Sequence, residues 1–167
     1  AIKKELNEPA NGIYAEVDPG KCAFCYTCWR LCPHAAMIPD FEAEEAVMKN
    51  LNEACSACGI CVSLCPAAAI SIKGGLGDKL KEKDSPSNTL KILCCENSAH
   101  IALQKIKDKQ LISFEKIDLS TISCGGEINA SQIISLLKQY QKVLVAVCID
   151  DACKHFDGNK RAYRQLL

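Results

Sequence analysis

The second half of the chain alternates short apolar runs with segments whose apolar residues recur at helical spacing. The apolar runs cover residues 90–94, 111–119 and 143–148, and each predicts a strand. Two stretches between them repeat apolar positions every three or four residues: Ala99, Ala102, Leu103 and Ile106, then Ile133, Leu136, Leu137 and Tyr140. A last helix is expected from about Gly158. This order predicts strand–helix units that form a three-stranded parallel sheet.

Polar residues mark where these helices begin. Asn97 or Ser98 is in place to cap the first helix, and Asn129 with Gln132 has the spacing of a capping pair. Right-handed crossovers place the first strand between the other two. The carboxyl ends of the strands then meet at one edge of the sheet, which is where ligands gather in such folds.

The first half contains an internal repeat. The run CAFCYTCWRLCPHAAM from Cys22 recurs as CSACGICVSLCPAAAI from Cys55, at a constant offset of 33 residues. Each copy reads C-x2-C-x2-C-x3-C-P, and Leu31, Ala35 and Ala36 have identical counterparts in the second copy. Self-similarity of this kind indicates a duplicated structural unit.

Residues 73–89 separate the two halves. They are rich in Gly, Lys, Asp, Ser and Pro, and they show no apolar periodicity. Such a composition predicts a linker, with the charged stretch from Lys79 to Asp84 as a solvated connector. The predicted organisation is therefore a domain at 1–72, a linker at 73–89 and a second domain at 90–167, with an α+β fold overall.

Charge and hydropathy exclude several classes of function. The 167 residues carry 20 Lys and Arg against 20 Asp and Glu, so no general attraction to nucleic acid or anionic lipid is expected. The longest apolar run, Val143 to Ile149, has seven residues, and AIKKELNEPA at the start lacks the apolar stretch of a signal peptide. We expect a cytoplasmic protein with no nucleic-acid or membrane partner.

The chain has 13 cysteines, which in a reducing compartment favour metal binding over disulfides. The spacing C-x2-C-x2-C-x3-C-P is typical of iron–sulfur proteins in which the fourth cysteine serves the other cluster. One 4Fe-4S cluster is therefore assigned to Cys22, Cys25, Cys28 and Cys65, and the other to Cys55, Cys58, Cys61 and Cys32. The alternative is zinc, but zinc sites use two C-x2-C pairs and have no need of a third cysteine or a trailing C-P.

From Tyr14 to Ile72 the chain resembles the bacterial-type ferredoxins with two 4Fe-4S clusters. The resemblance implies low-potential transfer of single electrons, with small residues such as Ala57, Gly59 and Ala67 letting the backbone approach the cluster. The first loop departs from the plainest ferredoxins because it carries Phe24, Tyr26 and Trp29. We interpret these aromatic residues as excluding water from one cluster.

Five cysteines remain in the second half. They are Cys94, Cys95, Cys124, Cys148 and Cys153, and three of them follow predicted strands. The sheet topology brings such residues to one edge, so a metal site is expected there. A set of inert buried thiols and a zinc site are the alternatives.

Residues 90–167 are similar to the delta subunit of the methyl-viologen-reducing hydrogenase family. The similarity rests on Cys124-Gly125, on Cys148-x4-Cys153 and on the following Gly158-Asn159. It implies one 2Fe-2S cluster, with Cys94, Cys124, Cys148 and Cys153 as the expected ligands and Cys95 as an alternate ligand. Two departures stand out, because Asn97 occupies the place of the usual second cysteine and Lys154, followed by His155, that of the usual histidine.

The resemblances imply an electron-transfer component of a larger oxidoreductase, without enzyme activity of its own. Its implied partners are a hydrogenase or formate dehydrogenase and a heterodisulfide-reductase-type flavoprotein complex of an anaerobe. Two alternatives remain open: a redox enzyme with Cys95 as a reactive thiol, and a zinc-stapled scaffold. His155 is a candidate hydrogen-bond donor to the third cluster, whereas His34 and His100 are interpreted as ordinary surface or core residues.

Overall fold

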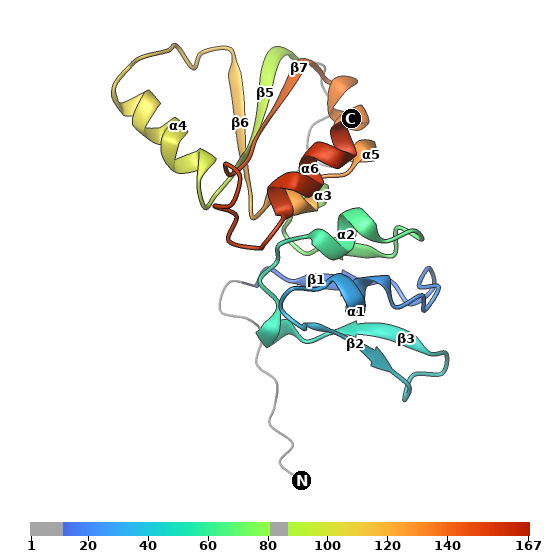
Figure 1. The fold of residues 1–167 in the computed structure, drawn as a ribbon. Coiled ribbons are helices and arrows are strands. Elements are labelled where there is room, and N and C mark those ends of the chain that lie inside the picture. Colours follow the sequence, from blue (N-terminus) through green and yellow to red (C-terminus); the bar gives the residue numbers. More distant parts are fainter. Residues whose placement is uncertain (1–11, 81–86) are drawn as a thin grey trace.

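A computed structural model describes residues 12–80 and 87–167, which form two α+β parts packed against each other (Figure 1). The blue-to-green part comprises the repeat, and the part coloured from yellow-green to red contains the parallel sheet. The predicted absence of a signal peptide concerns residues outside the described ranges. Within those ranges, none of the helices has the length and apolar content that a bilayer crossing requires.

The first part consists of two antiparallel strand pairs and two short helices. Strand β1 (Ala15–Val17) pairs with β4 (Ile70–Ile72), and β2 (Met37–Asp40) pairs with β3 (Val47–Asn50). The helices are α1 (Thr27–Leu31) and α2 (Ile60–Leu64), with a 3-10 turn η1 (Asn52–Ala54) between β3 and α2. Both helices end at a Cys-Pro pair, because proline forces the preceding residue into an extended conformation.

The repeat extends to the backbone torsions. Six residues adopt a left-handed conformation in three pairs, each pair related by 33 positions: Phe24 and Ala57, Tyr26 and Gly59, Ala35 and Ala68. Five of the six carry a side chain, and this conformation costs a non-glycine residue roughly 1–2 kcal/mol. Such strain persists only where the surrounding structure requires it, so both cysteine loops have the same enforced shape.

The second part contains a parallel sheet in the order β6-β5-β7, which confirms the predicted topology. Its strands are β5 (Ser87–Cys95), β6 (Ile117–Ile122) and β7 (Tyr140–Ala146). Strand β6 begins later than the predicted 111–119. The chain is still closing a helix at Leu111, whose N–H donates to Ile106 O, and a turn from Phe114 to Ile117 follows.

Three helices flank this sheet: α4 (Ala99–Asp108), α5 (Ala130–Leu137) and α6 (Gly158–Leu166). Figure 1 shows α4 on one side of the sheet and α5 with α6 on the other. The core on the second side contains Leu93, Ile122, Ile128, Leu136 and Tyr140. The predicted cap of α5 is confirmed as a reciprocal capping box, whereas Ser98 begins α4 without a side-chain cap bond.

The capping box gives the first testable prediction. Asn129 Oδ1 accepts from Gln132 N, and Gln132 Oε1 accepts from Asn129 N, both at 3.0 Å. Replacement of Asn129 by alanine is expected to lower the free energy of unfolding by about 1 kcal/mol and the thermal midpoint by roughly 2–4 °C. Thermal unfolding followed by circular dichroism measures the shift. The control Ser131→Ala, in the same helical turn, should stay within about 0.5 kcal/mol of the parent.

The predicted linker contains a short helix that joins the two parts. Helix α3 (Leu76–Leu80) lies within residues 73–89, and Leu76 is buried in the core of the second part. Its backbone N–H donates to Glu127 Oε1 at 2.7 Å, next to the 3-10 turn η2 (Gly125–Glu127). Most of the charged stretch from Lys79 to Asp84 falls outside the described residues.

Candidate metal centres

Each of the first two predicted cysteine sets lines one cavity. The first cavity is bounded by Cys22, Cys25, Cys28 and Cys65, together with Met48 and Ile70. The second is bounded by Cys32, Cys55, Cys58 and Cys61, together with Ala15, Met37 and Ile72. In both cases the fourth cysteine comes from the other copy of the repeat. The structure therefore places the eight residues as the crossed assignment requires.

Backbone amides point at the sulfurs of these sets. Ala36 N–H donates to Cys32 Sγ at 3.3 Å, and Ala69 N–H donates to Cys65 Sγ at the same distance. Ala57 N–H lies 3.4 Å from Cys55 Sγ. Amide donors stabilise a thiolate over a thiol, and in iron–sulfur proteins they also tune the reduction potential. The sites thus supply both the sulfur ligands and the donors that such ligands need.

The electrostatics of the second set show why it needs a cation. Burial, with added repulsion from Cys32 and Cys55, raises the pKa of the Cys58 thiol to about 11. Burial raises the pKa of Cys61 as well, with added repulsion from Cys58. Crowded thiolates in a dry site are unfavourable by themselves, and cationic iron removes that penalty. The donor set therefore fits an iron–sulfur cluster.

Cys25 of the first set differs from these buried residues. Its side chain is exposed, and Sγ lies 3.3 Å from Thr27 Oγ1. Hydrogen bonding to Thr27 lowers the pKa of this thiol. By contrast, burial raises the pKa of Cys28 in the same set to about 11. The first site is consequently open to solvent on the side of Cys25.

In the second part, four cysteines come together at the carboxyl edge of the sheet. Cys95 Sγ lies 3.6 Å from Cys148 Sγ. A Cβ atom added at Gly158 would lie 2.3 Å from Cys124 Sγ and 3.4 Å from Cys153 Sγ, so both sulfurs border the same glycine. Burial raises the pKa of Cys124, which also feels charge on Cys153 and Cys95. The group that gathers is Cys95, Cys124, Cys148 and Cys153.

Cys94 points away from this group. Its Sγ lies 3.6 Å from Ser120 O and 3.8 Å from Nδ1 of His100, which belongs to α4 on the opposite side of the sheet. The reason is the strand period of two, since adjacent residues of β5 face opposite sides. Cys95 shares its face with Leu93 and therefore with the core under α5. The structure thus brings the predicted alternate, rather than Cys94, to the other three cysteines.

The Gly158-Asn159 pair shapes the loop that carries Cys148 and Cys153. Asn159 is buried, and its Nδ2 donates to Cys148 O and Ile149 O, each at 3.2 Å. Gly158 leaves the space that the sulfur of Cys124 occupies. These two residues therefore have a mechanical role in the third site, which the sequence alone did not reveal.

The second and third sites lie next to each other across the two parts. Cys58, Ile60 and Cys124 form one buried cluster, and charge on Cys58 contributes to the raised pKa of Cys124. A Cβ atom at Gly126 would lie 3.3 Å from Cys58 O, so the two backbones also approach closely. The cysteine sites therefore follow one another in the order first, second, third.

A histidine pair bridges the parts beside this contact. His34 Nε2 lies 2.9 Å from His155 Nδ1, and His34 Nδ1 lies 3.3 Å from Ser56 Oγ. Burial, with His34 beside it, lowers the pKa of His155 to about 4, so the ring is neutral at pH 7. Ligand atoms of His34, Cys58 and His155 lie within 4.8 Å of one another. Sequence reasoning missed the pair because 121 positions separate its members.

Comparison with known families agrees with this two-part architecture. Residues 21–70 match the family of 4Fe-4S dicluster domains. Residues 90–167 match the family described as methyl-viologen-reducing hydrogenase, delta subunit. The protein is thus an iron–sulfur protein of the electron-transfer class. More particularly, the chain carries a 4Fe-4S dicluster domain followed by a methyl-viologen-reducing hydrogenase delta-subunit domain.

A curated relative extends the comparison. The pyruvate synthase subunit PorD of Thermotoga maritima is 39% identical over 54 residues, which is 32% of this chain and 50% of the relative. The chain spans about half the length of the curated relative that it matches. That relative's name describes it as a subunit of a pyruvate synthase, just as the matched family is named for a subunit of a hydrogenase.

Proposed function

We propose that this chain is a three-site electron relay within a larger redox complex. The observation that carries the proposal is the buried cluster of Cys58, Ile60 and Cys124, which joins the site lined by the second cysteine set to the cysteines at the sheet edge. Three bound clusters would supply one-electron redox chemistry without transfer of atoms. The chain's own residues hold the three sites in sequence and keep water away from the junction between the second and the third.

The proposed ligands follow from the geometry. Residues 1–72 hold two 4Fe-4S clusters through the crossed sets, Cys22, Cys25, Cys28 and Cys65 and then Cys55, Cys58, Cys61 and Cys32. Residues 90–167 hold one 2Fe-2S cluster through Cys95, Cys124, Cys148 and Cys153, with residues 73–89 as the connection. This third set replaces Cys94 of the sequence-based assignment by Cys95, because only Cys95 lies on the same face of the sheet as the other three.

The proposed partners are those that the delta-subunit similarity suggests. A hydrogenase or formate dehydrogenase would exchange electrons at one end, and a heterodisulfide-reductase-type flavoprotein at the other, in an anaerobic cytoplasm. The chain itself performs no substrate chemistry in this proposal. Cys95, the thiol considered for an enzymatic role, is only 1% exposed and lies against Cys148, so a substrate has no access to it.

Metal analysis and EPR test the proposal on anaerobically isolated protein. We expect about ten iron and about ten sulfide per chain, corresponding to two cubanes and one binuclear cluster. The dithionite-reduced protein should show the signals of interacting cubanes together with a separate binuclear signal. Zinc in place of iron, or a spectrum with the cubane signals alone, would overturn the three-site relay.

A further inference from the structure

The two copies of the repeat differ in what covers them. In the second copy, Cys58 contacts the third site and Gly59 packs against Glu127 of the second part. The equivalent residues of the first copy, 33 positions earlier, are Cys25 and Tyr26. No other part of the described chain covers Cys25, which is exposed. The first copy therefore has an open face at the place where the second copy is docked.

This open face carries a strip of aromatic side chains. Phe24 contacts Tyr26 with ring centroids 4.7 Å apart and Phe41 at 5.7 Å, and Tyr26 contacts Trp29 at 6.0 Å. Trp29 is 51% exposed and Phe41 is 69% exposed. Phe24, Tyr26 and Trp29 were interpreted from the sequence as a shield against water, yet Trp29 and the adjacent Phe41 face the solvent. Adjacent exposed aromatic residues are typical of an interaction site.

An acidic loop borders the strip. Glu42, Glu44 and Glu45 are exposed in the turn between β2 and β3, directly after Phe41. Asp40 is already paired with Lys49 at 3.4 Å. Among the neighbouring described cations, Lys21 is paired with Asp18, and Arg30 is exposed on α1 near Cys25. The rim of the face is thus negative, with Arg30 as its one counter-charge among these residues.

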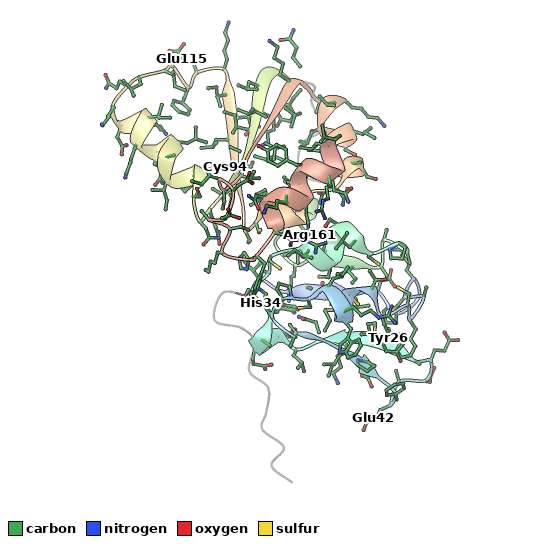
Figure 2. The ribbon with its side chains drawn as sticks, viewed as in Figure 1. Tyr26, His34, Glu42, Cys94, Glu115 and Arg161 are labelled. Carbon is green, nitrogen blue, oxygen red and sulfur yellow. The ribbon has the colours of Figure 1, made fainter. Side chains whose placement is uncertain are left out.

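The location of this face fits a terminal contact. Figure 2 shows Tyr26 and Glu42 at the end of the first part remote from Cys94 and Arg161, whereas His34 lies beside the second part. A second copy of this chain docked face to face would bring two sets of glutamates together, which is unfavourable. A partner with Lys and Arg around an apolar centre complements both the strip and its rim.

We propose that Phe24, Tyr26, Trp29 and Phe41, with Glu42, Glu44 and Glu45, form the docking face for a basic redox protein that exchanges electrons at Cys25. The inference rests on the proposed electron relay and adds the chemistry of one partner. One electron passes between the partner's redox centre and the first cysteine site, so one centre is oxidised as the other is reduced. No proton or other atom moves.

Stopped-flow oxidation of the dithionite-reduced protein tests the docking face. The probe is mitochondrial cytochrome c, a basic one-electron acceptor, and a small uncharged quinone reports the reactivity of the sites themselves. The variant Glu42→Lys/Glu45→Lys alters the face. The matched control, Asp108→Lys/Glu115→Lys, changes net charge equally in the second part, and Figure 2 shows Glu115 at the opposite end.

We expect the rate constant with cytochrome c at low salt to fall at least about tenfold in the face variant, with a flatter salt dependence, and less than about twofold in the control. Trp29→Ala should also lower the rate constant with cytochrome c, whereas the rate of quinone reduction should stay unchanged in every variant. Equal slowing by both double variants would overturn the proposal, as would no slowing by either. Sedimentation analysis gives a third test. If the wild-type protein is a dimer and Glu42→Lys/Glu45→Lys is a monomer, the face binds a second copy and the proposal is overturned.

The quinone separates the two proposals. If the parent protein reduces the quinone, and the face variant reduces cytochrome c as fast as the control does, only the docking face is contradicted. A parent protein that reduces neither acceptor contradicts the electron relay, and the docking face with it.

Discussion

Replacement of Cys95 by alanine is expected to remove the binuclear cluster, whereas Cys94→Ala leaves it in place. The two cysteines are neighbours in β5, but their side chains point in opposite directions. Cys95 Sγ lies 3.6 Å from Cys148 Sγ, whereas Cys94 Sγ faces His100 of α4. Iron should therefore fall from about ten to about eight per chain in Cys95→Ala. EPR of the reduced protein should lose the binuclear signal and keep those of the cubanes.

The Cys94→Ala variant is a matched control because both side chains are buried and equal in size. Its cost should be about 1 kcal/mol of stability, as for an ordinary core substitution, with iron content and EPR unchanged. The reverse outcome, in which Cys94→Ala loses the binuclear signal and Cys95→Ala retains it, would refute our ligand set and restore the assignment made from the sequence.

Replacement of Gly59 by alanine is expected to force the two parts of the chain apart. The added Cβ would lie 2.4 Å from Glu127 Cβ and 2.5 Å from its Cα, so a buried backbone must move. Overpacking of this kind costs about 1–3 kcal/mol, which corresponds to a thermal midpoint lower by roughly 2–12 °C. The magnetic interaction between the second and third sites should weaken as well, and EPR of the reduced protein measures that loss.

Backbone strain adds roughly 1–2 kcal/mol to the cost of Gly59→Ala, but strain at one residue would not weaken the magnetic interaction. Tyr26 occupies the equivalent position in the first copy and has a φ of 60°, close to the 72° of Gly59, so a side chain is tolerated at this φ where the backbone of the second part does not lie against it. Gly77→Ala is the control, because an added Cβ at this helical position meets no atom within 4 Å. If Gly59→Ala matched Gly77→Ala in both midpoint and EPR spectrum, close packing at Glu127 would not be what joins the parts.

The sequence predicted the features that depend on local pattern. The offset of 33 gave the two cysteine sets that line the two cavities, and the crossover rule gave the order β6-β5-β7. The sequence analysis chose Cys94 as the ligand and Cys95 as the alternate, because apolar residues on both faces of β5 do not show which of the two cysteines faces the other three. A one-residue difference in parity moves a side chain to the opposite face.

The contacts between the two parts were beyond sequence reasoning. Glu127 reads as a surface carboxylate, yet it is 2% exposed and accepts from Leu76 N. His34 and His155 meet only because the whole second part packs on α2 and the loop before it. Nothing local in either segment marks these residues, since their partners are determined by tertiary packing.

A duplicated unit with equivalent halves has no inherent polarity, because either half can serve as entrance or exit. The covering of Gly59 and the exposure of Tyr26 remove that equivalence in this chain. One half is covered by the second part, so among the described residues only the other presents this face to solvent. A glycine in one copy and a tyrosine in the other thus give the duplicated unit two different ends.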